Sequence, residues 1–455
     1  MPSETITPLL AHRARTNIQW FTHKHMRQVS RLNAKQHRVN MMTAENWSIR
    51  DELVDQYKAL FAQHLSPRHL SYADGMGGDA ELLQAAADFF NRVFAAHSRV
   101  QPAHLVVGAG CSSLLENLLY DICEPGEGVL IETPFWGGFE TSFVLRSNVT
   151  AVHVRPPCHG GNGSADLDRL VSAYIEAYER ALRQAPCRIK AILVCNPHNP
   201  CGHIYPPRVI QALLQFAQRH DLFYISDEIY ALSTLDEQTA FTSVLSIDVA
   251  ALGVDLARVF TLYSISKDLG SSGLRLVYCL ISSDSQGLRR TDTVQGFGIT
   301  QAHPDLRLSL AISNHSRVST FTSLVITALL HDPEAATTIL HQNRAALQRS
   351  AKLISDFLAF HQIPFVPPAA GVYVWARLGW RSSSRPGDEP SWDEEARLND
   401  RFEAAGVSVG AGQGYCASEP GWFRITFAIP REELVAGLRR IEQVVGMEGQ
   451  KWTAI

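Results

Sequence analysis

The chain has 455 residues, enough for two or three domain-sized cores, and its 45% hydrophobic and 19% charged residues are typical of soluble globular proteins. The formal net charge is −4. Proteins that bind nucleic acid or an anionic membrane surface carry a basic excess, so this balance argues against both functions.

Neither a membrane span nor an export signal is expected. No apolar run reaches the ~18 residues of a transmembrane helix, and MPSETITPLLAHRARTNIQW lacks a compact apolar stretch after a basic start. The eight cysteines form no CxxC pair, which argues against a zinc knuckle or a thioredoxin-type site. We therefore expect reduced thiols, no metal and a cytoplasmic location.

The pattern along the chain predicts three regions. Residues 1–69 predict an irregular arm and a helix, SIRDELVDQYKALFAQHL, which we assign to part of a small domain. Residues 70–305 contain seven short apolar runs with helical segments between several of them, which predicts an α/β domain with a mostly parallel sheet and helices on both faces. The runs are HLVVGAG, GVLIETP, VTAVHVRP, KAILVCNP, LFYISDEIY, VFTLYSIS and LRLVYCLIS.

Residues 306–455 show a different pattern. A long helical stretch leads to the apolar runs GVYVWARL and WFRITFAI and to a terminal helix, REELVAGLRRIEQVV. This order predicts a second, smaller α+β domain.

The segment HLVVGAGCSSLLENL predicts a strand, a small-residue turn and a helix. It resembles a dinucleotide-binding fingerprint, with Glu132 at the end of the next apolar run, although Ser stands where the third Gly or Ala is expected. A nicotinamide-dependent oxidoreductase is therefore one alternative. The backbone N–H groups of Gly110, Cys111 and Ser112 at a helix start suit a phosphate in either case.

Three successive apolar runs end in polar groups: NPHNPCG with Asn199, then Asp227, then Lys267. Ligands of an open parallel sheet bind at the carboxyl ends of its strands. Taken singly, these groups are also consistent with a turn, a helix cap and a surface lysine. Together they indicate a shared site.

The chemistry of these groups points to pyridoxal 5′-phosphate. Lys267 supplies an amine for a Schiff base, and Asp227 suits a protonated pyridine nitrogen. Tyr230, three residues on, is placed to reach the phenolate oxygen of the same ring. Polar side chains suited to the phosphate follow close by: Ser264, Ser266 and Arg275.

These motifs make the chain resemble the fold-type I, class I/II aminotransferase family over about residues 40–445. NPHNPCG resembles the family's N-P-x-N-P-x-G, and SISKDLGSSGLR its S-x-S-K-x-x-x-x-x-G-x-R. The resemblance implies a cofactor-bound Lys267, Asp227 on the pyridine nitrogen, and Tyr230 and Asn199 on the phenolic oxygen. It also implies that Trp136 stacks on the ring, and that Tyr72 is lent to the phosphate of a neighbouring subunit in a homodimer with shared active sites.

Within that family the chain resembles 1-aminocyclopropane-1-carboxylate synthases. CASEPGWFRITFA is similar to their C-S-E-P-G-W-F-R-x-x-F-A, which implies that Arg424 binds the substrate carboxylate. AEN makes Glu45 a candidate active-site acid; a helix-start carboxylate is the alternative. The chain departs from these synthases at Trp47, at Phe135–Trp136 and at Asp74–Gly77, and these departures argue against cyclopropane formation.

The resemblance implies an enzyme that acts on an amino-acid-like substrate through an external aldimine and α-proton abstraction by Lys267. We expect a synthase-like lyase of specialised metabolism that cleaves a C–S bond or performs a related elimination, similar to C–S lyases of fungal epidithiodiketopiperazine pathways. An aminotransferase using a 2-oxo acid is the alternative within this chemistry. A catalytically inactive relative is a further alternative, against which the complete cofactor set argues.

Overall fold

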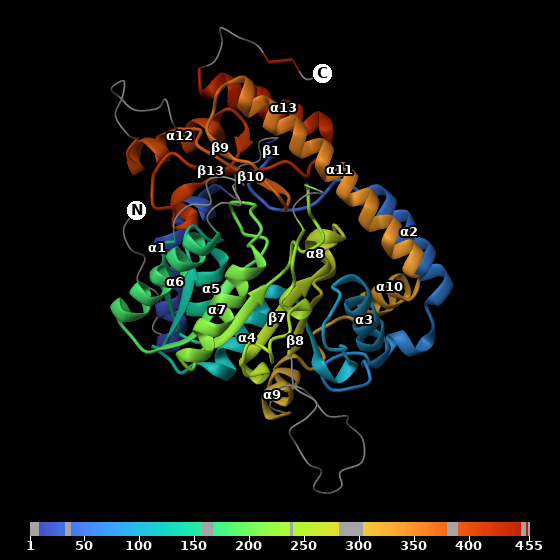
Figure 1. Cartoon of the computed structure of the whole chain (residues 1–455). Coiled ribbons are helices and arrows are strands. Elements are labelled where there is room, and N and C mark those ends of the chain that lie inside the picture. The colour runs from blue at the N-terminus through green and yellow to red at the C-terminus, as the bar shows by residue number, and fades with distance from the viewer. Residues whose placement is uncertain are drawn as a thin grey trace, which may run out of the picture.

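The computed structural model describes residues 9–31, 38–156, 167–236, 240–281, 304–379, 390–446 and 452–453. Within these segments the chain forms one large sheet and two smaller ones, with helices around them (Figure 1). No helix of the described segments is long and apolar enough to cross a membrane.

The large sheet has seven strands in the order β2-β8-β7-β6-β5-β3-β4. Neighbouring strands run parallel except at β8, which is antiparallel to both β2 and β7. Each of the seven predicted apolar runs forms one of these strands, so the expected mostly parallel sheet is confirmed. The strands are β2 (Leu105–Gly108), β3 (Gly128–Glu132), β4 (Thr150–Val154), β5 (Ile189–Cys195), β6 (Phe223–Asp227), β7 (Val259–Ser264) and β8 (Val277–Ile281).

Helices cover both faces of this sheet because alternate strand residues point to opposite sides. Ala191 and Leu193 of β5 pack with α4, α5 and α9, whereas Ile192 and Val194 pack with α6 and α7. Farther along the second face, α3 and α10 cover β2 and β8. These helices are α3 (Ala80–Val93), α4 (Cys111–Ile122), α5 (Gly138–Val144), α6 (Leu167–Gln184), α7 (Pro207–Arg219), α9 (Pro304–Asn314) and α10 (Thr320–His331).

A second unit lies beyond the carboxyl ends of the parallel strands (Figure 1). Its antiparallel sheet has the order β12-β13-β10-β9, and a separate two-stranded sheet pairs β1 with β11. This α+β unit agrees with the predicted fold class, while the exact domain boundaries remain a prediction. Its elements are β1 (Val39–Asn40), β9 (Phe365–Val366), β10 (Tyr373–Ala376), α12 (Trp392–Ala404), β11 (Val407–Ser408), β12 (Gly410–Ala411), β13 (Phe423–Thr426) and α13 (Arg431–Val444).

The prediction of an irregular N-terminal arm is wrong. Residues His12–Arg31 form the 20-residue helix α1, and only then does the chain continue through β1 to the predicted helix α2 (Arg50–His64). A long-range contact helps to hold α1, since Asn17 Nδ2 donates to the carbonyl of Leu145 at the end of α5, at 2.7 Å. Such a contact leaves no periodic apolar signal in the sequence.

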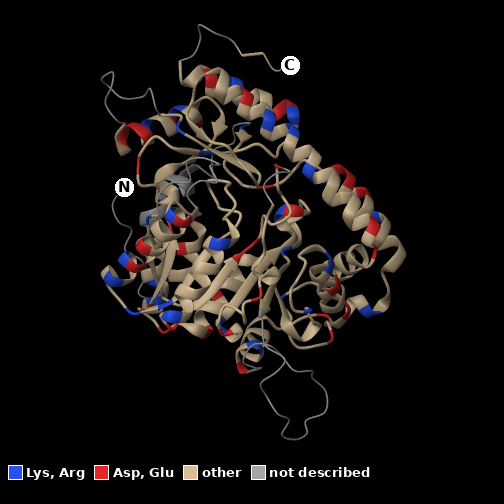
Figure 2. Ribbon diagram, in the orientation of Figure 1, with Lys and Arg blue, Asp and Glu red and all other residues tan. Residues whose placement is uncertain are grey.

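Helix α11 (Pro333–Phe360) connects the two units. Its first half contributes Ile339 to the core around α3 and α10, and its second half contributes Ile354 and Phe357 to the core of the small sheet. Charged residues of both signs are interspersed along the outside of α11 and α13, whereas the central strands are mostly uncharged (Figure 2). The helix therefore belongs to both cores.

Asn343 lies on α11 between Ile339 and Ile354 and is fully buried. Its Nδ2 donates to the carbonyl of Asp268 at 2.9 Å, and its Oδ1 accepts from Asn46 Nδ2 at 2.6 Å. The same Asn46 nitrogen also reaches the carbonyl of Lys267 at 3.0 Å. Two buried amides thus hold the short helix α8 (Ile265–Asp268) in place.

We predict that Asn343→Leu lowers the free energy of unfolding by about 1–3 kcal/mol. The substitution leaves the Asp268 carbonyl without its Asn343 donor and Asn46 Nδ2 without its Asn343 acceptor, and it opens no large cavity. Urea unfolding measures this change. Gln342→Leu is the matched control, because Gln342 is the neighbouring exposed amide of the same helix, and we expect a change within about 0.5 kcal/mol there. Equal effects of the two substitutions would contradict the proposed importance of the amide pair.

Candidate active site

The carboxyl ends of β5, β6 and β7 lie side by side at one edge of the large sheet. Cys195 of β5 pairs with Asp227 of β6, and Asp227 pairs with Leu262 of β7. The turn with Asn199 follows β5, and Lys267 follows β7 on α8. This edge faces the small unit (Figure 1), so the three polar strand ends occupy the seam between the two cores.

The amine of Lys267 points away from α8 and donates to the carbonyl of Ala44 at 2.5 Å. Burial lowers the pKa of this amine to about 8, and the positive charges of Arg424 and Arg275 act in the same direction while Glu45 opposes them. The neutral, nucleophilic form of Lys267 is therefore well populated slightly above neutral pH, which a surface lysine does not achieve.

Asp227 is 1% exposed, and its carboxylate accepts from the backbone N–H of Ile229 at 3.3 Å. Burial raises its pKa to about 7, against the lowering effects of that hydrogen bond and of the Lys267 charge. A cation brought next to Asp227 would favour the ionised carboxylate further. The position therefore suits a partner that carries a positively charged N–H group.

Tyr230 is fully buried and meets the ring of Tyr373 edge-to-face, with 5.2 Å between the ring centroids. Burial raises the pKa of Tyr230, although the nearby Arg424 charge lowers it in part. Its hydroxyl thus stays protonated near neutral pH and can donate a hydrogen bond to an oxygen in the seam.

The start of α4 and the loop after α8 form a cradle for an anion. Gly110 precedes α4 with φ of +94°, and no side chain caps the first N–H groups of the helix, to which Cys111 and Ser112 belong. A Cβ at Gly110 would overlap the guanidinium of Arg275, so that guanidinium lies against the helix start. Uncapped N–H groups beside a guanidinium suit a phosphate.

Two serines complete the turn that carries Lys267. The Ser264 hydroxyl caps α8 by accepting from the backbone N–H of Ser266 at 3.1 Å, and it lies 2.7 Å from the Ser266 hydroxyl. Ser264 also donates to the carbonyl of Leu276 at 2.8 Å, next to Arg275. The hydroxyls and Arg275 therefore belong to one hydrogen-bonded loop.

Arg424 is 3% exposed on β13 and points from the small unit into the seam. Its Nη1 donates to Asn199 Oδ1 at 3.0 Å and its Nη2 to the carbonyl of Met42 at 2.5 Å. Its guanidinium carbon lies 5.1 Å and 4.9 Å from the ring centres of Tyr373 and Tyr415. Nε has no hydrogen-bond partner among the described residues, which suits a carboxylate ligand.

Glu45 lies above the loop after α8 and is held by three neighbours. It accepts from the Ser272 hydroxyl at 2.8 Å and from Trp47 Nε1 at 3.2 Å, and it pairs with Arg50 at 3.3 Å. Burial raises its pKa, but the Ser272 hydrogen bond and the Arg50 charge outweigh this, so the pKa lies below its usual value. The carboxylate is ionised and fixed, close enough to influence Lys267.

The remaining predicted residues lie in different surroundings. Trp136 is half-buried and meets Phe139 edge-to-face at 5.4 Å, next to Gly138. Tyr72 is 88% exposed on the surface of the single chain. The other predicted residues surround the seam or the cradle, whereas no contact among the described residues brings Tyr72 to Lys267.

Sequence reasoning missed several contacts of the site. The carbonyl of Ala44, the rings of Tyr373 and Tyr415, and the pair Asn46–Asn343 all orient predicted residues. Two of them lie at recognised motifs, since Tyr415 directly precedes CASEPG and Asn46 ends AEN. A backbone carbonyl such as that of Ala44 carries no residue-type signal at all.

Glu132, the acid of the dinucleotide alternative, is buried beside α6 and α7. It accepts hydrogen bonds from the hydroxyls of Tyr205 and Tyr174, the latter at 3.3 Å, and burial raises its pKa to about 7. A ribose-binding carboxylate must be reachable from the helix start. Glu132 is instead part of the sheet–helix interface.

Comparison with known proteins gives the family. The sequence profile of the family Aminotransferase class I and II matches residues 48–441. The chain is 95% identical to "Probable aminotransferase gliI" of Aspergillus fumigatus over the full length of both proteins. It is 36% identical to "Aminotransferase verI" of Clonostachys rogersoniana over 96% of this chain and 94% of that one. The nicotinamide alternative is therefore wrong.

More distant relatives agree with the motif analysis. "1-aminocyclopropane-1-carboxylate synthase-like protein 1" of Takifugu rubripes is 29% identical over 90% of this chain and 62% of that protein. An aspartate aminotransferase double mutant of Thermus thermophilus superimposes with a TM-score of 0.69 at 22% identity, over 96% of this chain and 99% of that chain. The predicted family is confirmed: this chain is a pyridoxal-phosphate-dependent enzyme of the class I and II aminotransferases.

Proposed function

We propose that the enzyme acts on an amino-acid-like small molecule and removes its α-proton, with cleavage of a C–S bond or a related elimination as the outcome. The observation that carries this proposal is the Lys267 amine, whose pKa is lowered to about 8 and which lies in the seam with Arg424 and Asp227. An amine of this kind is neutral often enough to accept a carbon-bound proton near neutral pH.

Each neighbouring residue has a role in the proposal. Arg424 binds the α-carboxylate. The rings of Tyr373 and Tyr415 orient its guanidinium, and its Nε has no hydrogen-bond partner among the described residues. Bound pyridoxal phosphate supplies an electron sink for the charge left on the α-carbon. The residues that hold it are Asp227 at the pyridine nitrogen, Tyr230 and Asn199 at the phenolic oxygen, Trp136 on the ring, and Gly110, Cys111, Ser112, Ser264, Ser266 and Arg275 at the phosphate.

The proposed outcome is an elimination because of the motifs around Glu45 and Arg424. Both motifs are similar to those of 1-aminocyclopropane-1-carboxylate synthases, whose chemistry expels a sulfur substituent. In a β-elimination the C–S bond breaks, the sulfur leaves with the bonding electrons and takes up a proton, and the remaining carbon skeleton hydrolyses to a 2-oxo acid and ammonia. We assign Glu45 to substrate binding beside Lys267.

Transamination is the second candidate. The names of two relatives, 95% and 36% identical to this chain, contain the word aminotransferase. Transfer uses the same proton removal by Lys267 and differs in where the proton returns. A 2-oxo acid is then required as the acceptor of the amino group.

The proposal includes a homodimer with shared active sites and a cytoplasmic location. Tyr72 is 88% exposed in the single chain, together with Leu70 at 78%. A tyrosine this exposed is available to the site of a second copy. The seven cysteines within the described segments form no disulfide with one another, and a reducing compartment suits such thiols.

Product analysis separates the two outcomes. Purified enzyme is incubated with S-substituted cysteine conjugates and with ordinary amino acids, with and without a 2-oxo acid, and the products are identified by mass spectrometry. We expect a thiol, ammonia and a 2-oxo acid to form without an added acceptor. A strict requirement for the acceptor, with the amino group recovered on it, would establish the aminotransferase instead.

In the same assay Lys267→Ala is expected to lower turnover by at least about 1,000-fold, since it removes both the covalent attachment and the proton acceptor. The visible absorbance of the attached cofactor should disappear as well. Lys352→Ala is the matched control, because Lys352 is an exposed lysine of α11 that pairs with Asp356 at 2.8 Å. Full activity of Lys267→Ala would overturn the proposal whatever the substrate.

The lowered pKa of Lys267 predicts how cofactor attachment depends on pH. The neutral amine attacks, so the attachment rate of cofactor-free enzyme should rise about tenfold per pH unit below about 8 and level off above it. Stopped-flow absorbance measures this rate. N-acetyl-lysine methylamide is the control, with a midpoint near the ordinary 10.5. A midpoint near that value in the enzyme would contradict the role of burial.

Mixing two variants tests the shared site. Hybrid dimers of Lys267→Ala with Tyr72→Ala contain one site with both substitutions and one site with neither, if Tyr72 serves the partner. Equal, random mixing should then restore about a quarter of the wild-type activity. Activity no higher than the mean of the two parents would show that Tyr72 does not cross to the other subunit.

A further inference from the structure

Three side chains with metal-binding donor atoms meet at the seam outside the cofactor cradle. Glu140 lies on α5, His153 on β4, and Cys416 directly after the turn η7 (Gly412–Tyr415). Glu140 Oε1 is 3.7 Å from His153 Nε2 and 3.8 Å from Cys416 Sγ, and all three donor atoms lie within 4.8 Å of one another. Glu140 Oε1 therefore lies close to both the His153 nitrogen and the Cys416 sulfur.

These distances fit a tetrahedral metal ion. Zn²⁺ binds carboxylate oxygen and imidazole nitrogen at about 2.0–2.1 Å and thiolate sulfur at about 2.3 Å. Tetrahedral angles then separate neighbouring donors by about 3.3–3.6 Å. The separations of 3.7 Å and 3.8 Å from Glu140 Oε1 exceed this range by a few tenths of an ångström, and the imidazole nitrogen and the sulfur lie within 4.8 Å of each other, so the ligands must draw together when an ion binds. The Cys416 thiol, which donates to Glu140 Oε1, then exchanges that hydrogen bond for a bond to the metal.

The surroundings hold the three ligands in place. The Phe135 ring meets the His153 imidazole edge-to-face at 5.3 Å, and the Phe135 N–H donates to the carbonyl of Tyr415 at 2.8 Å. That hydrogen bond fixes the residue before Cys416 against the large sheet. The His153 side chain is 33% exposed and that of Glu140 15%, so an ion can enter from solvent.

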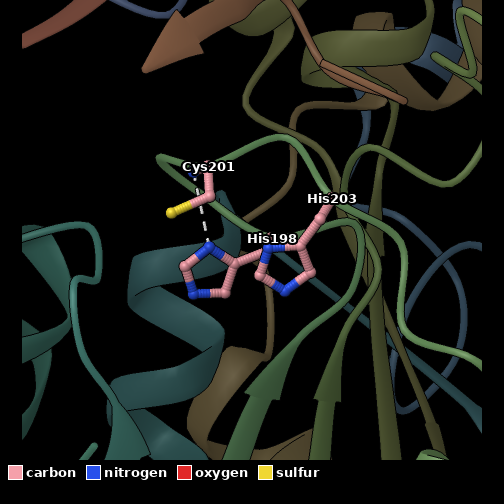
Figure 3. A group of neighbouring side chains, drawn as sticks. All are labelled: His198, Cys201 and His203. Atoms are coloured by element: carbon pink, nitrogen blue, oxygen red, sulfur yellow. Dashed lines mark hydrogen bonds between the residues drawn. The ribbon is translucent and has the colours of Figure 1, made fainter. Parts of the chain in front are cut away.

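A second cluster, His198, Cys201 and His203, lacks this convergence (Figure 3). Its two imidazoles stack at 4.5 Å with 8° between their planes. The nitrogen lone pairs lie in the ring planes, so those of two stacked rings do not point at one ion. His198 Nδ1 also accepts the Cys201 N–H at 3.4 Å.

We propose that Glu140, His153 and Cys416 form a zinc site that links the small unit to the large sheet. The Cys416 thiol gives up its proton to solvent when the ion binds, and water fills the fourth position. The site lies next to Trp136 and Tyr415, and the bound ion holds the turn of the small unit against α5 and β4.

Zinc titration of the cofactor-loaded enzyme tests the proposal. The protein is freed of metal with a chelator, ZnCl₂ is added, and affinity is measured by competition with a chromophoric chelator. We expect one tightly bound zinc per chain in the wild type. Substituting a residue that only supports a zinc ligand lowers metal affinity about 10–100-fold. Substituting a ligand itself should cost at least as much, so Cys416→Ser and His153→Gln should each weaken zinc binding by at least about tenfold.

His203→Gln is the matched control, since it changes a histidine of the stacked cluster. Unchanged zinc affinity in both Cys416→Ser and His153→Gln, or an equal loss in His203→Gln, would overturn the proposal. Cadmium gives an independent readout, because a thiolate-to-cadmium ultraviolet absorbance should appear in the wild type and be absent in Cys416→Ser. If Cys416→Ser does not fold, the half-exposed His153→Gln decides the outcome.

Discussion

The site depends on two buried amides that fix the backbone of a four-residue helix. Asn46 donates to the carbonyl of Lys267 and Asn343 to that of Asp268. The N–H of Gly270 also donates to the carbonyl of Lys267 at 3.2 Å, so side-chain and backbone donors together satisfy this turn. These hydrogen bonds hold the turn that carries the Lys267 amine, and burial of that amine lowers its pKa to about 8.

The charges of the seam are arranged around this amine. Arg424 enters from the small unit between two tyrosine rings, which offer π faces in place of water, and its positive charge keeps the neighbouring lysine deprotonated more often. Asp227, buried on the other side, holds a pKa near 7 and is ready to pair with a cation. The two units thus contribute opposite parts of one electrostatic arrangement, and neither unit alone contains a complete site.

The fold and the cofactor were predictable from the sequence, because hydrophobic periodicity and the residue types at strand ends are local properties, while the role of each cofactor residue stays a prediction. β5, β6 and β7 are consecutive and adjacent, so their terminal residues had to meet. Helix α1 and the contact between Lys267 and the Ala44 carbonyl were not predictable, since each depends on segments brought together by packing. Glu140, His153 and Cys416 come from three separate parts of the chain, so no spacing motif reveals them.

The position of Asn343 on α11 has a mechanical consequence. The 28-residue helix is on the order of 42 Å long, and its two halves are embedded in different cores, with Asn343 near the point where one core gives way to the other. If the small unit rotated about that point, residues far from Asn343 would be displaced more than residues close to it. Arg424, on β13 of the small unit, would then move across the seam. Lys267 would keep its position, because α8 is hydrogen-bonded to Asn343 and Asn46.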